Sequence, residues 1–427
     1  MAGRGAAEGE PSDPIREGAK RAEPSESAIA PSRCEERRTL PPSPKIAIVK
    51  LSALGDVIHA LPVARALRRH FSDASLTWIV EAREYAILRD HPDLDRVLPV
   101  DTRLWRRLIW RPSRSRQVWG KLGRLRLRVR AARFDVAIDL QGLLKSGLLT
   151  AYTGARLRIG FSAGHCRERV NALFTNRHVT PPPGAVHVVA QYLSLLEPLG
   201  VPTAAPEFHL PARPEAERRI ADFLDERGLK SSDRLVALNP GAGRPDKRWP
   251  VSHFRALAER LATEAGARVL LLWGPDEIHM ARQIGDGRGS RPVLAPPTDL
   301  DELTALLRRA SLMIANDTGP LHLAAAVGTP ALGLYGPTRA ERNGPYGPRC
   351  RGLQSPDGTM AGLAPDTVFE AAQALLERTP HPHPVPLPPE LSRGGGSRTG
   401  PLAPPPAPEG RDGRAAEGQG EGDRGTR

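Results

Sequence analysis

The sequence predicts an α/β fold built from two parallel sheets that are covered by helices. Short apolar runs alternate with stretches of helical periodicity, which is typical of parallel strands joined by helices. This alternation occurs twice, in residues 45–160 and 235–336, and a proline-rich stretch lies between them. Because the two series share an architecture, we expect two Rossmann-like domains that face a cleft.

The first series begins with residues 45–51 (KIAIVKL), which predict a buried strand. Residues up to about 70 follow as a helix, in which Val57, Leu61, Ala64 and Leu67 have helical spacing. The later strands of this series are expected at residues 76–80, 96–100 and 136–140 and near 159–160, with helices up to about 133 and over 141–150.

The second series predicts strands at residues 235–238, 268–273, 312–315 and 331–335 and a helix over 253–265, with further helices at 215–227 and 365–378. We place the domains at residues 45–200 and 234–378 and the linker at 201–233. Residues 1–44 and 379–427 are rich in Pro, Gly and charge without apolar periodicity, and we expect both tails to be disordered.

The formal net charge of +13 makes polyanions plausible partners. Twelve Lys or Arg residues and no acids lie between residues 102 and 134, interleaved with Trp105, Trp110 and Trp119. A solvated helix face is one interpretation. The others are binding to nucleic acid, to anionic lipid headgroups, or to a substrate that carries phosphate and carboxylate.

The three cysteines, Cys34, Cys166 and Cys350, are widely spaced, which disfavours a disulfide framework or a zinc site. The first residues lack the apolar stretch of a signal peptide, and no apolar run reaches about eighteen residues. We therefore expect a cytoplasmic protein.

Two turns in the second series are suited to phosphate. Residues 316–330 (NDTGPLHLAAAVGTP) predict a strand that feeds a helix, so Asp317, Thr318 and Gly319 would lie at the positive end of the helix dipole. Residues 239–250 (NPGAGRPDKRWP) place a glycine loop before cations such as Lys247. Either turn alone is more typical of ordinary capping, but together they predict a nucleotide site.

The first series lacks the glycine pattern that dinucleotide-binding folds use for a tight turn. Instead, residues 52–62 (SALGDVIHALP) place Asp56 in the first turn of a helix. A lone acid at this position usually stabilises the helix dipole.

Five segments, in this order, resemble the ADP-heptose:lipopolysaccharide heptosyltransferase family: KLSALGDVIHALPV, FDVAIDLQGLLKSG, NPGAGRPDKRWP, NDTGPLHLAAAVGTP and LYGPT. The resemblance covers residues 45–378. Within the family the chain is most similar to heptosyltransferase I, through WIVEA at 78–82, RLWRR at 103–107 and LFTNR at 173–177.

The resemblance implies GT-B architecture and an inverting glycosyltransferase that uses neither a metal nor another cofactor. It implies transfer of heptose from ADP-L-glycero-β-D-manno-heptose to a Kdo (3-deoxy-octulosonic acid) residue of the lipopolysaccharide inner core. The position of Asp56 matches the family's proposed general base. Because a helix start lowers a carboxylate pKa and so makes a weaker base, a Kdo-side or substrate hydrogen bond would have to compensate.

The resemblance also assigns donor-binding residues. Lys247 would face the leaving diphosphate, and Asp317, Thr318, Gly319 and His322 match a turn that holds the diphosphate and sugar. By a looser alignment, the position of Glu277 suits the ribose hydroxyls. The family motif carries threonines where this chain has Gly241, Ala242 and Gly243, so backbone amides are the expected donors there.

Four arginines match positions that resemble the acceptor's anion-binding residues: Arg103, Arg106, Arg107 and Arg167. Their guanidinium groups suit the carboxylate of Kdo and the phosphate of lipid A. The rest of the basic segment would hold the enzyme against the anionic inner membrane, on its cytoplasmic face. These expectations exclude nucleic acid as the partner.

Two alternatives stay open from the sequence. One is a related transferase of the family that uses another nucleotide sugar or acceptor. The other is a non-catalytic anion-binding protein of the same fold, which the presence of both Asp56 and Lys247 disfavours. We expect His59 to be an ordinary packed histidine.

Overall fold

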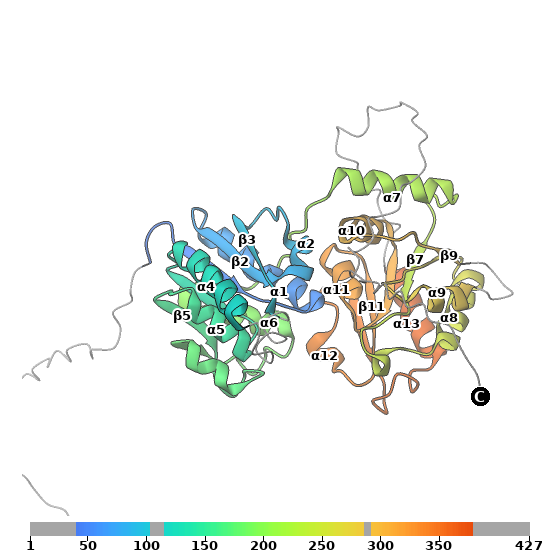
Figure 1. Cartoon of the computed structure of the whole chain (residues 1–427). Helices are drawn as coiled ribbons and strands as arrows, with labels where there is room; N and C mark the ends of the chain where they lie inside the picture. Colours follow the sequence, from blue (N-terminus) through green and yellow to red (C-terminus); the bar gives the residue numbers. More distant parts are fainter. Residues whose placement is uncertain (1–39, 103–114, 286–291, 379–427) are drawn as a thin grey trace, which may run out of the picture. The chain divides into compact units, whose positions relative to one another are not determined.

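Two six-stranded sheets form the framework of the chain (Figure 1). The structure is a computed structural model, and it describes residues 40–102, 115–285 and 292–378. All strand pairings in both sheets are parallel, which confirms the predicted α/β class. Both predicted tails, except residues 40–44, and Arg103, Arg106 and Arg107 lie outside the described residues.

The first sheet has the order β3-β2-β1-β4-β5-β6. Its strands are β1 (Lys45–Val49), β2 (Ser75–Glu81), β3 (Arg96–Val100), β4 (Val136–Asp139), β5 (Leu157–Phe161) and β6 (Arg177–Val179). The helices of this half are α1 (Leu54–His70), α2 (Tyr85–Leu88), α4 (Ser115–Ala131), α5 (Leu144–Tyr152) and α6 (Val188–Ser194), with 3-10 helices η1 (Ala82–Glu84), η3 (Arg169–Phe174) and η4 (Glu197–Leu199).

The second sheet has the order β12-β11-β10-β7-β8-β9. Its strands are β7 (Leu235–Asn239), β8 (Arg268–Leu271), β9 (Val293–Leu294), β10 (Leu312–Asn316), β11 (Ala331–Tyr335) and β12 (Cys350–Gln354). The helices are α7 (Pro214–Glu226), α8 (Val251–Thr263), α9 (Ile278–Gly285), α10 (Leu300–Arg309), α11 (Gly319–Ala326), α12 (Ala340–Asn343) and α13 (Pro365–Glu377), with the 3-10 helix η5 (Pro245–Lys247).

Both sheets have the same doubly wound topology, because each is built outward in two directions from its first strand. The direction reverses between β1 and β4 in the first sheet and between β7 and β10 in the second. In open α/β sheets, ligands bind beyond the carboxyl ends of the strands at this reversal. The loops after β1, β4, β7 and β10 are therefore the places to look for a site.

The central strands carry apolar residues on both faces, as parallel strands covered by helices require. In the second sheet, Val236 and Leu238 of β7 pack with Phe254 and Leu257 of α8 and with Phe369 of α13 in one buried cluster. In the first sheet, Ala47 and Val49 of β1 share a cluster with Val129 of α4 and Leu149 of α5. These contacts hold in place the carboxyl edges of the two sheets, from which the loops after β1, β4, β7 and β10 extend.

Most strands were predicted within about two residues, whereas several other elements were not predicted. The missed strands are β6, β9 and β12, and the missed helices include α6 and α10. β9 has two residues, and β12 buries only Leu353, so neither forms an apolar run.

The two sheets fall within residues 45–200 and 234–378, while the domain boundaries themselves stay a prediction. None of the described helices combines the length and apolarity needed to cross a bilayer.

Candidate active site

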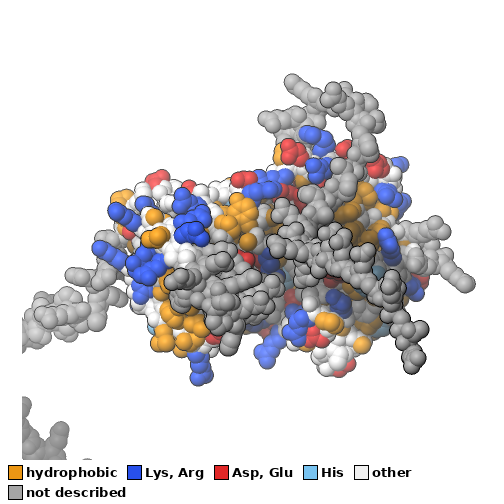
Figure 2. All heavy atoms as spheres, viewed as in Figure 1, with side chains coloured by type: hydrophobic (Ala, Val, Ile, Leu, Met, Phe, Trp, Pro, Cys, Tyr) orange, Lys and Arg blue, Asp and Glu red, His pale blue; other side chains and the backbone are white. Residues whose placement is uncertain are grey.

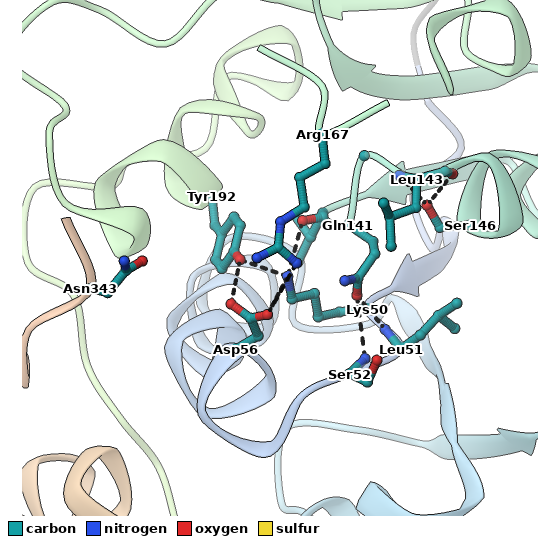
Figure 3. A network of polar contacts seen from close by, with 12 residues as sticks. Lys50, Leu51, Ser52, Asp56, Gln141, Leu143, Ser146, Arg167, Tyr192 and Asn343 are labelled. Carbon is teal, nitrogen blue, oxygen red and sulfur yellow. Dashed lines mark hydrogen bonds and ion pairs between the residues drawn. The ribbon is translucent and has the colours of Figure 1, made fainter. Parts of the chain in front are cut away.

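The first half of the site is the start of α1. Because α1 follows β1 directly, its first turn carries Asp56 to the carboxyl edge of the first sheet. Three side chains converge on this carboxylate, and we call the four residues the Asp56 cluster: Lys50, Asp56, Arg167 and Tyr192 (Figure 3). They come from the end of β1, from α1, from the loop before η3 and from α6.

The contacts that the other three side chains make with the Asp56 carboxylate are long. The Tyr192 hydroxyl donates to Asp56 Oδ1 at 3.4 Å, while Arg167 and Lys50 nitrogens lie 3.6 and 3.9 Å from Oδ2. Lys50 is 1 % exposed, and its ammonium donates to the Tyr192 hydroxyl at 2.6 Å and to the carbonyl of Leu140 at 3.4 Å. Asp56 retains 23 % of its side-chain exposure, so its oxygens remain accessible to a ligand.

Burial and charge act in opposite directions on these groups. Burial raises the pKa of Asp56, but the positive charges of Lys50 and Arg167 outweigh it and hold the pKa below its usual value. Burial lowers the pKa of Lys50 to about 8, although Asp56 opposes that shift. Burial raises the pKa of Tyr192 well above its usual value, so the phenol stays a neutral donor. Asp56 is therefore ionised at neutral pH.

The loop after β4 fixes the backbone beside Asp56. Gln141 Oε1 accepts from the backbone N–H groups of Leu51 at 3.0 Å and Ser52 at 3.3 Å. Buried Asp139 in turn accepts from the backbone N–H of Gln141 at 2.8 Å and from the amide nitrogen of Asn171 at 2.7 Å. These bonds hold the approach to α1 in one conformation.

The second half of the site is the start of α11, which follows β10. Asp317 lies there and is 12 % exposed. Its Oδ2 accepts from the Lys247 ammonium at 2.7 Å and from the Thr338 hydroxyl at 3.0 Å, and its Oδ1 lies 3.4 Å from His322 Nε2. We call Lys247, Asp317, His322 and Thr338 the Asp317 cluster. Although burial opposes it, the contacts with His322 and Lys247 lower the pKa of Asp317 to about 2.

The glycine loop after β7 is pinned to the same edge by two asparagines. Asn239 Oδ1 accepts from the Gly241 N–H at 3.0 Å. Asn316 Nδ2 donates to the carbonyls of Pro240 and Gly241 at 2.9 and 3.1 Å, and its Oδ1 accepts from the Trp249 N–H at 3.1 Å. A single buried side chain thus ties β10 to both ends of the loop that carries Lys247.

The Glu277 carboxylate packs directly against the backbone of Gly241. Glu277 Oε2 accepts from the Gly274 N–H at 3.1 Å. A Cβ atom on Gly241 would lie 1.9 Å from that oxygen, so the Glu277 carboxylate would have to move, whereas a Cβ on Gly243 would meet nothing within 4 Å. A side chain at Gly241 would therefore displace Glu277, and a side chain at Gly243 would not.

The starts of α1 and α11 face each other within the compact unit that begins at Ser43. A Cβ atom on Gly55 would lie 2.6 Å from His322 Cδ2, and one on Gly319 would lie 2.7 Å from Leu54 Cδ2. The ring centroids of His59 and His322 are 4.2 Å apart. These two glycines let helices from different sheets meet, and they bring Asp56 and Asp317 to one crevice.

Two adjoining cavities form this crevice. The larger has a volume of about 800 Å³ and is lined by predicted donor residues: Gly241, Ala242, Gly243, Lys247, Glu277, Asp317, Thr318 and Gly319. The smaller has a volume of about 490 Å³ and is lined by Asp56, Arg167 and His322 together with Lys247, Asp317, Thr318 and Gly319. The shared lining residues join the two cavities.

The structure thus brings together every predicted site residue that it describes; Arg103, Arg106 and Arg107 lie outside the described residues. Sequence reasoning missed Lys50, Tyr192, Gln141 and Thr338. A lysine at the end of an apolar strand was the available signal for Lys50. Tyr192 had no local signal, because it reaches the site from α6, which the sequence did not predict.

Comparison with known proteins places these features in a family. Residues 122–373 match the family described as Glycosyltransferase family 9 (heptosyltransferase). The lipopolysaccharide heptosyltransferase 1 of Pseudomonas aeruginosa is 34 % identical over 309 residues, which cover 71 % of this chain and 81 % of that protein. The Escherichia coli protein of the same name is 29 % identical over 333 residues, covering 78 % and 100 %.

Solved structures agree. The E. coli heptosyltransferase WaaC with ADP superposes with a TM-score of 0.65 at 26 % identity, covering 78 % of this chain and 99 % of that one. The same enzyme with ADP-2-deoxy-2-fluoro heptose gives a TM-score of 0.64 at 26 % identity, covering 77 % and 99 %. The motifs, the GT-B arrangement of two Rossmann-like domains and these similarities lead to one conclusion: the chain belongs to glycosyltransferase family 9, the heptosyltransferases.

Proposed function

We propose that this glycosyltransferase moves heptose from ADP-L-glycero-β-D-manno-heptose to a Kdo residue of the lipopolysaccharide inner core, with inversion and without a metal. The observation that carries the proposal is the crevice that Asp56 and Lys247 line together. A base on one side of a sugar and a cation on the other are what an inverting displacement needs. The relatives named for heptose transfer and for bound ADP support the choice of donor.

In this mechanism, the acceptor hydroxyl attacks the anomeric carbon while its proton passes to a carboxylate oxygen of Asp56. The bond between that carbon and the diphosphate oxygen breaks, and the electron pair leaves with ADP. Lys247 and the first N–H groups of α11 stabilise the charge that develops on the diphosphate. A diphosphate at that place shares the Lys247 ammonium with Asp317. The transition state has oxocarbenium character.

The rest of the donor fits the larger cavity. Trp273, Pro275 and Leu303 line it and offer apolar surface to a nucleobase, while Glu277 faces the same space and can accept from ribose hydroxyls. The volume of about 800 Å³ lies in the range of small-molecule sites. The Gly241 to Gly243 loop supplies backbone N–H groups rather than side-chain hydroxyls.

The acceptor enters through the smaller cavity. Arg167 lines it, is 54 % exposed and can hold the Kdo carboxylate while it borders Asp56. We assign Arg103, Arg106 and Arg107 to the same task from their sequence positions. The basic segment around them brings the enzyme to the anionic cytoplasmic surface of the inner membrane, where a lipid A acceptor resides.

Transfer from ADP-heptose to a Kdo-terminated acceptor, followed by analysis of the linkage and anomeric configuration, tests the proposal. We expect an inverted heptosyl product. A thermal-shift series with ADP, UDP and GDP checks the donor, because a nucleotide that binds the folded state raises the unfolding temperature. Stabilisation by UDP and not by ADP would mean a family transferase with another donor.

A further inference from the structure

An exposed apolar surface lies beside the smaller cavity. Leu144 and Leu148 are one turn apart on α5, and both are exposed. Val170 and Leu173 are three residues apart on η3, where a 3-10 helix aligns such side chains, and they are 41 % and 80 % exposed. We call these four residues the α5–η3 surface.

α5 and η3 are fastened to each other, so the four side chains belong to one rigid corner. Gly147 of α5 lies so close to η3 that a Cβ atom there would be 2.8 Å from Phe174 Cδ2. Asn171 Nδ2 donates to the Leu143 carbonyl at 2.8 Å, and the Leu144 N–H donates to Glu168 Oε2 at 2.6 Å. Leu173 is therefore exposed on an ordered element rather than at a loose end.

Basic side chains predominate in the part of the chain that forms this corner. Residues 143–180 carry six basic side chains, Lys145, Arg156, Arg158, Arg167, Arg169 and Arg177, against the single acid Glu168. The neighbouring helix α4 adds more, since its Arg126 lies 6.0 Å from the ring of Tyr152 on α5. Figure 2 shows Lys and Arg side chains near hydrophobic ones on the half of the molecule that holds the first sheet.

Exposed apolar side chains together with basic ones indicate what kind of partner binds the α5–η3 surface. Exposed leucines are unfavourable in water, and the excess of basic side chains in the same segment disfavours an apolar protein partner unless acids on it face them. An anionic bilayer satisfies both, because its headgroups attract the cations and its acyl boundary accepts the leucines. Leu143 and Arg167, which adjoin this corner in sequence, line the smaller cavity.

We propose that the α5–η3 surface inserts into an anionic lipid bilayer and so docks the smaller cavity at the membrane. The link to the cavity rests on the proposed function, because only a lipid-borne acceptor needs that cavity at the bilayer. The insertion of the surface into a bilayer does not rest on the proposed function. It adds an apolar anchor to the electrostatic attraction of the basic segment.

Flotation of the full chain with vesicles tests the insertion without any substrate. Wild-type protein should bind vesicles of phosphatidylcholine mixed with phosphatidylglycerol and keep part of that binding at high salt, since salt screens charge but not apolar burial. The double variant Val170→Asn/Leu173→Asn should bind them at least about tenfold more weakly. Leu173→Trp should bind more tightly, because Trp favours the membrane interface.

Val186→Asn is the matched control, since Val186 is 40 % exposed and lies outside the α5–η3 surface; its binding should equal that of the wild type. The double variant should also retain heptose transfer to a deacylated, water-soluble Kdo acceptor. Equal vesicle binding by the wild type and the double variant would overturn the proposal, as would a dimer in solution that the double variant abolishes. Failure of transfer by the wild type would instead count against the proposed function.

Discussion

The two aspartates of the crevice both lie at a helix start beside the reversal point of a sheet, and they have different surroundings. Each lies at the start of a helix that follows a buried parallel strand at the reversal point of its sheet. Asp317 accepts short bonds of 2.7 and 3.0 Å from Lys247 and Thr338. The side-chain partners of Asp56 lie at 3.4 to 3.9 Å.

This difference indicates a division of labour. A carboxylate whose oxygens already accept short bonds from a cation and a hydroxyl is a poor proton acceptor, because hydrogen bonds to the charged form stabilise it. Asp317 is thus suited to hold Lys247 in place. Asp56 is charged, partly exposed and only loosely contacted, so an acceptor hydroxyl can approach it.

The largest effect should come from replacing Asp56, which we propose as the general base. Asp56→Asn should lower kcat by about 10² to 10⁴-fold, the usual contribution of a general base, while leaving ADP affinity nearly unchanged. Asp317→Asn should mainly weaken ADP-heptose binding, because it releases Lys247. Steady-state kinetics and calorimetric titration with ADP separate the two. A greater loss of kcat in Asp317→Asn would reverse the assignment.

The next effect concerns the leaving group. Lys247→Met should lower kcat by about 10² to 10³-fold, because it removes the ammonium aimed at the diphosphate charge. Arg244→Met is the control, since Arg244 lines both cavities but pairs with Asp246 and is largely exposed. Its kcat should fall much less. Comparable losses in the two variants would mean that general positive potential, not a placed cation, assists departure.

A smaller effect appears in the pH profile. The Lys50 ammonium helps to hold the pKa of Asp56 down, so Lys50→Met should raise that pKa. A lowered carboxyl pKa means that the basic form is lost only when the pH falls through the lowered value. The acidic limb of kcat/KM should therefore move to higher pH in the variant, with kcat changed by on the order of tenfold.

Lys145→Met is the control for that profile, because Lys145 pairs with Glu81 instead of with Asp56. Its acidic limb should stay in place. If the acidic limb of kcat/KM stayed in place in Lys50→Met while activity fell, the role of Lys50 would be structural and not electrostatic.

The smallest effect is expected from alanine substitutions at two glycines of the loop after β7. Gly241→Ala should weaken ADP binding by less than about tenfold, because its Cβ must displace the flexible end of Glu277. Gly243→Ala should bind ADP like the wild type, since its Cβ meets open space. Calorimetric titration of both variants is the measurement. Equal affinities would remove Glu277 from the nucleotide site.

Sequence patterns predicted the central strands and the loops that follow them because a buried parallel strand is a continuous apolar run, and the helix that follows must start at a fixed edge. That reasoning, with the family resemblance, reached Asp56 and Asp317 and their partners Arg167, Lys247 and His322, but it did not reach Tyr192 or Thr338. Tyr192 approaches Asp56 across 136 positions of chain, and Thr338 reaches Asp317 from beyond β11. Contacts of this kind depend on packing between elements, which local periodicity does not encode.

The central claim is that Asp56 and Lys247 act on opposite sides of the reacting sugar. A crystal structure with a non-transferable ADP-heptose analogue and a Kdo-terminated acceptor tests it most directly. It should show the diphosphate against Lys247 and the start of α11, with Asp56 Oδ within hydrogen-bond reach of the acceptor hydroxyl on the opposite face of the anomeric carbon. An Asp56 carboxylate on the diphosphate side, or out of reach of that hydroxyl, would contradict the account.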